Sequence, residues 1–189
     1  MRKFYLPAIF SLVIVCANAT IRTVSNTPST LAQFNTIQAA VDASSSGDTV
    51  YVHGSPNQYA SFAITNKQLV IIGPGWSPDK NLPFDAEIIG CTITGTSCSN
   101  TEIQGLVFVG TIAISTNHPD NLRFIRNRFY RLSLQITEGG VSYTGYLFEG
   151  NWFDNSQVSA ATNSTYQNFL FQNNYFHEFG CCVNGNISG

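Results

Sequence analysis

The amino-acid sequence predicts an all-β protein, a right-handed parallel β-helix (a solenoid) with a short N-terminal capping helix. Three observations lead to this prediction: a Phe and Asn repeat in the second half of the chain, a helix followed by two strands near its start, and a polar composition with few charges. Only 11% of the residues are charged while 43% are hydrophobic, against roughly 25% charged in an ordinary globular protein. The 189 residues correspond to a single domain.

The repeat consists of a Phe, an Asn three residues later, and a second Phe two residues after the Asn. It occurs at 124–129, 148–153 and 171–176, with a weaker copy at 103–108. Successive copies start 21, 24 and 23 residues apart, which suits one coil of three short strands. Because equivalent residues of stacked parallel coils lie above one another, the Phe residues are expected in the core. A hydrogen-bonded ladder is expected from Asn127, Asn151 and Asn174.

The start of the predicted solenoid contains a helix that would cover its open end. Ile37, Ala40 and Val41 fall on one face of a short helix. Strands are predicted at 49–52 and 68–72, and the second ends at a Gly-Pro-Gly turn. A helix laid over the first coil covers both its apolar core and its unpaired backbone.

The stretch from 36 to 75, TIQAAVDASSSGDTVYVHGSPNQYASFAITNKQLVIIGPG, resembles the first coil of pectinesterases and of bacterial β-helix repeat proteins in the pectin-lyase-like superfamily. This resemblance implies the fold and a polysaccharide partner. The catalytic patterns of that superfamily are not found: the chain has no Asp-Asp pair, no Gly-His-Gly and no clustered acids. No cofactor is evident, and calcium is expected only if the protein is a lyase.

Residues 1–19 have the three-part pattern of a secretory signal peptide. Arg2 and Lys3 precede an apolar run, and Ala17-Asn18-Ala19 supplies small residues for cleavage after Ala19. The apolar run is too short for a comfortable membrane span, so no span is expected after signal removal. The mature chain, 20–189, is expected to be secreted or on the cell surface. Its seven basic and eleven acidic residues give a net charge of −4, which argues against nucleic acid as a partner.

Two cysteines are candidates for a disulfide. Cys91 and Cys98 are close enough in sequence to close a small loop in an exported protein, although the sequence does not decide whether they pair. No metal site is predicted, because His53, His118 and His177 are far apart and none has a ligand-type spacing to a cysteine pair.

Two residues are candidates for acid–base chemistry. Asp154 and His177 each follow the closing Phe of their repeat by one residue, so stacking would make them neighbours and a candidate catalytic pair. The alternative is a surface turn position that tolerates polar side chains.

A cluster of basic residues is a candidate substrate-binding surface. Four arginines occur within nine residues with no acid between them: Arg123, Arg126, Arg128 and Arg131. Arginine pairs well with carboxylates, so the cluster is a candidate for binding an acidic polysaccharide. The alternative is a solvated face neutralised by Glu149 and Glu178 of the following coils.

Several aromatic residues fall outside the two Phe columns and are expected on the outside of the coils. These residues are Tyr130, Tyr143, Tyr146, Trp152 and Tyr175. Outward aromatic rings would suit sugar stacking, whereas the Phe columns belong to the core.

The leading functional hypothesis is a secreted, carbohydrate-associated β-helix protein with no assignable active site in this chain. One alternative is a polysaccharide lyase or carbohydrate esterase whose catalytic coils lie beyond residue 189. Another is a structural or adhesion solenoid. Since no closing cap is visible after the fourth repeat, the solenoid is expected to be incomplete at its C-terminus or to oligomerise there. The oligomeric state is left open.

Overall fold

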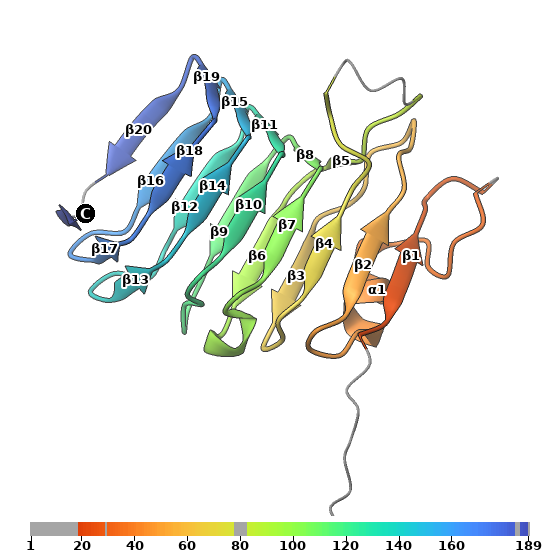
Figure 1. Ribbon diagram of the computed structural model, residues 1–189, viewed down its shortest axis with the longest axis horizontal. Helices are drawn as coiled ribbons and strands as arrows, with labels where there is room; N and C mark the ends of the chain where they lie inside the picture. Colours follow the sequence, from red (N-terminus) through yellow and green to blue (C-terminus); the bar gives the residue numbers. More distant parts are fainter. Residues whose placement is uncertain (1–18, 29, 78–82, 184–185, 189) are drawn as a thin grey trace, which may run out of the picture.

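The computed structural model describes residues 19–28, 30–77, 83–183 and 186–188, with side chains up to residue 180. The predicted signal peptide, apart from Ala19, lies outside these ranges. Within them the chain forms a parallel β-solenoid of about five turns (Figure 1). This confirms the predicted all-β class.

Four parallel sheets run along the solenoid, and every strand pairing within them is parallel. Sheet A contains β1 (Ile21–Val24), β2 (Thr49–Val52), β4 (Val70–Ile72), β7 (Glu102–Gln104), β10 (Arg123–Ile125), β14 (Leu147–Glu149) and β18 (Leu170–Gln172). Sheet B contains β5 (Glu87–Ile88), β8 (Val107–Phe108), β11 (Arg128–Tyr130), β15 (Trp152–Asp154) and β19 (Tyr175–His177). Sheet C contains β3 (Phe62–Thr65), β6 (Cys91–Thr94), β9 (Thr111–Ile114), β12 (Ser133–Ile136), β16 (Gln157–Ala160) and β20 (Gly180–Val183). Sheet D contains β13 (Ser142–Thr144), β17 (Thr165–Gln167) and β21 (Asn186–Ser188).

The strand register matches the predicted repeat. Phe124 pairs with Ile103 on one side and with Phe148 on the other, and Phe148 pairs with Phe171. The rings of Phe124 and Phe148 stack with centroids 5.1 Å apart, and those of Phe148 and Phe171 with centroids 4.5 Å apart. Stacked rings of this kind fill the core of each coil.

The asparagine ladder forms as the spacing predicts. The backbone N–H of Asn127 donates to Oδ1 of Asn151 at 2.8 Å, and the N–H of Asn151 donates to Oδ1 of Asn174 at the same distance. The Nδ2 atom of Asn151 donates to the carbonyl oxygen of Phe124 at 2.9 Å. Asn127 and Asn151 are almost fully buried, so these bonds satisfy backbone groups that water cannot reach.

The coils turn their corners at single residues with left-handed backbone. Between sheets B and C these are Arg131, Asn155 and Glu178, with φ of 52°, 46° and 48°. The corner between sheets A and B has Gly105, Arg126, Gly150 and Asn173, with φ of 68°, 52°, 63° and 55°. Glycine and asparagine adopt this conformation most readily. The abundance of asparagine in the chain therefore has an architectural cause in these corners.

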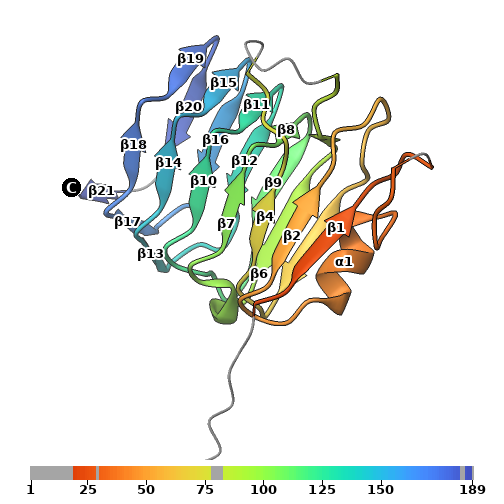
Figure 2. The ribbon, with the colours of Figure 1, turned by 45° about the vertical axis from the view of Figure 1, so that its right-hand side comes forward.

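The helix α1 (Ile37–Ala43) covers the first coil, as predicted. Thr36 caps it by accepting a hydrogen bond from Ala39 N at 3.2 Å, and Ile37 is buried. Figures 1 and 2 show α1 beside β1 and β2, at the opposite end from the C-terminus. The strand β1, which the sequence analysis did not identify, pairs with β2 and becomes the edge of sheet A. A short 3-10 helix, η1 (Thr96–Cys98), follows β6.

Whether Cys91 and Cys98 pair was left open by the sequence, and in the structure both are free, buried thiols. The Cys98 thiol donates to the carbonyl oxygen of Thr94 at 3.1 Å, and burial raises the pKa of Cys91. The expected outward position of Tyr143 and Tyr146 is wrong, because both side chains are fully buried. The reason is sheet D, which gives the later coils a fourth side with its own inner aromatic column.

Candidate functional site

The outer face of sheet B has two columns of aromatic, charged and imidazole side chains. The strands β11, β15 and β19 point a Phe inward at their central position, and Phe129 and Phe153 there are 1% exposed. The flanking residues therefore face outward. One outer column is Arg128, Trp152 and Tyr175, and the other is Tyr130, Asp154 and His177, each in direct register.

Trp152 is the centre of an aromatic cluster on this face. The guanidinium carbon of Arg128 lies 4.2 Å from the Trp152 ring centroid, a cation–π distance. The Trp76 ring lies 5.3 Å from that of Trp152, and the Tyr175 ring lies 5.8 Å from it. Trp76 comes from the loop after β4, so a segment distant in sequence completes the cluster. Tyr175 is 60% exposed and offers its ring to solvent.

Asp154 contacts side chains from the two neighbouring coils, Arg128 and His177, as its register predicts for His177. Its Oδ2 atom lies 2.9 Å from Nη2 of Arg128 and its Oδ1 atom 3.0 Å from Nδ1 of His177. Hydrogen bonds from Arg128 and then from His177 lower the pKa of Asp154, against the opposing effect of burial. Asp154 is thus held as a carboxylate that orients the imidazole. The His177 side chain is 54% exposed, so its other ring nitrogen is accessible to a ligand on this face.

A hollow of about 360 Å³ adjoins this cluster at the corner between sheets A and B. Trp76 belongs to both the hollow and the cluster. Arg126 and Gln104 contribute polar groups to the lining, and Gly105 and Gly150 occupy the left-handed corner positions. The hollow extends the outer face of sheet B around the corner of the solenoid.

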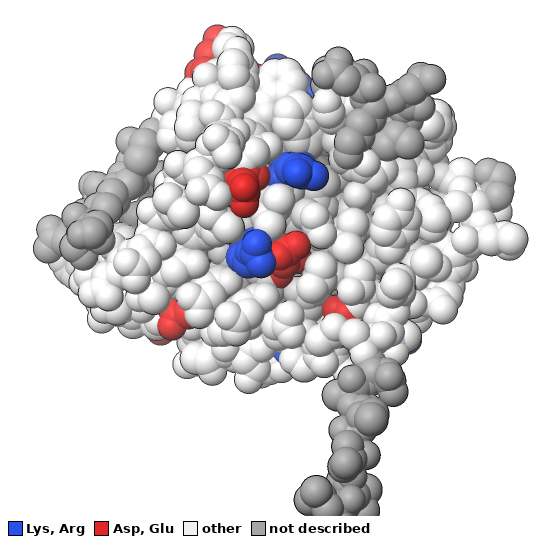
Figure 3. All heavy atoms as spheres, viewed as in Figure 1, with Lys and Arg blue, Asp and Glu red and all other residues white. Residues whose placement is uncertain are grey.

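The four arginines of the predicted basic cluster are spread over different sides of one coil. Arg123 lies on sheet A and pairs with Glu102 at 3.1 Å, while Arg128 lies on sheet B and pairs with Asp154. Arg126 and Arg131 are corner residues, and neither forms an ion pair within the described part of the chain. The structure thus separates these arginines, and the acids that pair with two of them are not the expected glutamates. Figure 3 shows few charged side chains on the face in view.

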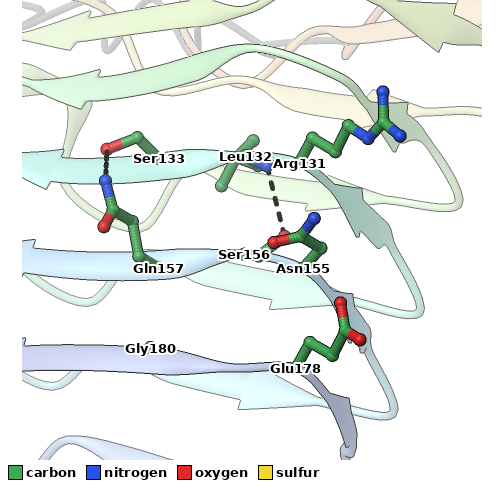
Figure 4. Close-up of a pocket in the computed structure, with 8 residues that line it drawn as sticks. All are labelled: Arg131, Leu132, Ser133, Asn155, Ser156, Gln157, Glu178 and Gly180. Carbon is green, nitrogen blue, oxygen red and sulfur yellow. Dashed lines mark hydrogen bonds between the residues drawn. The ribbon is translucent and has the colours of Figure 1, made fainter.

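A second hollow, of about 510 Å³, lies at the corner between sheets B and C. Figure 4 shows Arg131 and Glu178 at the corner, with Ser133 and Gln157 further along the strands of sheet C. Gln157 Nε2 donates to Ser133 Oγ at 3.4 Å. The guanidinium of Arg131 lies 5.1 Å from the ring of Tyr130, which connects this hollow to the outer face of sheet B.

No protein-family model, curated protein or solved structure matches the chain.

Over the described ranges, no group of three or more His, Cys, Asp or Glu side chains is arranged to hold a metal ion. In the same ranges no helix has the length and apolar character needed to cross a membrane.

Trp152, Asp154 and His177 could be predicted from the repeat, whereas Trp76 could not. Trp76 lies directly after the Gly-Pro-Gly turn and outside the repeat, so periodicity gave it no partner. Its signal was composition: the chain contains two tryptophans, and both lie in this cluster.

Proposed function

We propose that this chain is a secreted, carbohydrate-associated β-helix protein that binds a polysaccharide on the outer face of sheet B. The observation that carries the proposal is an aromatic cluster in which the Trp152 ring centroid lies 5.3 Å from that of Trp76 and 5.8 Å from that of Tyr175. Aromatic rings offer large, rigid apolar faces, which suit the C–H faces of sugar rings. Arg128 and Asp154 beside them supply hydrogen-bonding groups for hydroxyls.

The shape of the site favours a polymer over a single sugar. The two outer columns continue over three successive coils, and parallel strands are spaced about 4.8 Å apart. A chain of linked sugars laid along the solenoid axis would therefore meet an equivalent position on each coil. The hollow at Trp76 and the hollow at Arg131 widen this surface at its two margins.

The proposal includes export of the protein and a right-handed solenoid. The signal-peptide pattern of residues 1–19 supports export. The resemblance of 36–75 to pectin-lyase-like proteins supports a polysaccharide ligand, and the strong preference of parallel crossovers for the right hand supports a right-handed coil.

Binding is tested by affinity electrophoresis of the mature chain in gels that contain neutral, uronic or sulfated polysaccharides. The native protein is expected to be retarded by at least one class. Trp152→Ala and Tyr175→Ala should weaken retention roughly tenfold, as expected for loss of one stacking ring. Tyr51→Ala is the matched control, because Tyr51 is a half-buried aromatic residue of β2 on sheet A. Native protein that no polysaccharide retards would contradict the proposal and favour a structural or adhesion solenoid.

A second candidate function is polysaccharide cleavage or deesterification, which the Asp154–His177 contact favours. Here His177 would act as general acid or base toward the polysaccharide, and Asp154 would hold the imidazole ring in place. The test is product release from pectin and alginate, with and without calcium, by native protein and His177→Ala. Activity that disappears in the variant supports this function, and its absence from native protein contradicts it.

A further inference from the structure

The backbone nitrogen of Thr20 lies 2.8 Å from Oδ1 of Asp48. Thr20 directly precedes β1, and Asp48 lies in the turn between α1 and β2. Asp48 is 3% exposed, whereas Thr20 is exposed. The start of the predicted mature chain is therefore placed against a buried carboxylate.

Asp48 contacts the residue before β1, the turn after α1, and β1 itself. Its Oδ2 atom accepts a hydrogen bond from Ser45 N at 2.9 Å, and it lies 3.5 Å from Nη2 of Arg22 on β1. Hydrogen bonds from Thr20 N and then Ser45 N lower the pKa of Asp48, so it is a carboxylate at neutral pH. The other nearby cation, Lys67, is engaged at the end of α1, where it donates to the carbonyl oxygens of Val41 and Ser44.

We propose that signal-peptide removal creates an ammonium group at Thr20 that forms an ion pair with Asp48 and so fastens β1 to the cap. Hydrolysis adds water across the Ala19–Thr20 amide, leaving a carboxylate on Ala19 and an ammonium on Thr20. The existing bond already has a charged acceptor, the Asp48 carboxylate, and cleavage gives it a charged donor as well. The inference depends on the predicted cleavage site and is independent of polysaccharide binding.

The ion pair matters because β1 is the edge of sheet A. On one side β1 pairs with β2, and its N-terminal end is held by the Thr20–Asp48 contact. An edge strand with unpaired backbone groups is prone to fraying and to pairing with other chains. In the processed chain the added charge would oppose fraying of the first strand, whereas the unprocessed chain would have only the neutral amide at this position.

Four proteins test the inference: the chain starting at Thr20 with a free amine, the same chain with a Gly-Ser extension before Thr20, and each of these two forms with Asp48→Asn. The extension keeps the amide donor and removes the charge, so it is the matched control. At pH 6 the free-amine form is expected to melt about 2–4 °C above the extended form. In the Asp48→Asn background this difference should disappear.

The pH dependence gives a second readout that does not require the variant to fold. An α-amino group titrates near pH 8, and pairing with a carboxylate raises its folded pKa. With Asp48 ionised, the stabilisation should be fully present between about pH 4 and pH 8 and lost as pH rises through the folded pKa of the amine. Equal melting temperatures of the free and extended forms at pH 6, or a difference that persists above pH 10, would overturn the inference. Cleavage of exported protein at a site other than Ala19–Thr20, seen by mass spectrometry, would also overturn it.

Discussion

The Nδ1 atom of His177 lies 3.0 Å from Oδ1 of Asp154, across the boundary between two successive coils. Asp154 also pairs with Arg128. Its two partners differ in exposure, since the imidazole of His177 is more exposed than the guanidinium of Arg128. Asp154→Ala is expected to lower the free energy of unfolding by about 1–3 kcal/mol, because Arg128 loses its partner. His177→Ala should lower it by less than about 1 kcal/mol, since the imidazole is half exposed. Urea denaturation of both variants checks this order, and equal losses would contradict it.

Acid is expected to destabilise the solenoid through its buried carboxylates. The folded pKa values of Asp48 and Asp154 are both lowered, while an unfolded Asp titrates near pH 3.9. Their contribution to stability is therefore present above about pH 4 and lost as pH falls through the folded pKa values. Thermal melts from pH 7 to pH 2 should show this fall, with a smaller slope for Asp48→Asn. Asp42→Asn, at an exposed helix position, is the control that should keep the native slope.

The asparagine ladder is expected to stabilise the solenoid more than an outward amide does. Asn151→Ala removes bonds to Phe124 and Asn174 and leaves the backbone N–H of Asn127 without its acceptor. Each buried group left without a partner costs about 1–3 kcal/mol, so the variant should lose several kcal/mol in urea denaturation. Gln157→Ala, which removes one long bond on the outside, should change stability by less than about 0.5 kcal/mol. Similar losses in the two variants would mean that the ladder does not support the fold.

Replacing a strained corner residue should stabilise the protein. Arg131 has a φ of 52°, and its counterpart on the next coil is Asn155 with a φ of 46°. Left-handed backbone costs an ordinary residue about 1–2 kcal/mol and costs asparagine less. Arg131→Asn is therefore expected to raise the melting temperature by about 2–4 °C. Arg123→Asn is the matched comparison, because it lies in β10 and loses its ion pair with Glu102, so it should not stabilise. A drop in melting temperature for Arg131→Asn would show that its side chain contributes more than the strain costs.

Much of this fold could be predicted from sequence because stacked coils carry the same residue types at equivalent positions. The Phe columns and the ladder at Asn151 recur on each coil, so their spacing revealed both the register and the neighbours of Asp154. The strand β1 and Trp76 could not be predicted in this way, since each meets a partner that occurs once. The left-handed backbone of Arg126 and Arg131 could not be predicted from residue type, because arginine does not favour this conformation. The corner of the coil imposes it, and the equivalent positions on neighbouring coils are occupied by Gly or Asn.

The most direct test of polysaccharide binding on sheet B is intrinsic tryptophan fluorescence. Trp76 and Trp152 are the two tryptophans of the chain, and their rings lie 5.3 Å apart at the centre of the proposed site. Titration of the mature protein with neutral, uronic and sulfated polysaccharides is expected to shift or quench this emission in a saturable manner for at least one class, with a weaker response in Tyr175→Ala. An emission spectrum that stays unchanged with every polysaccharide, while circular dichroism shows an intact β-fold, would contradict the account.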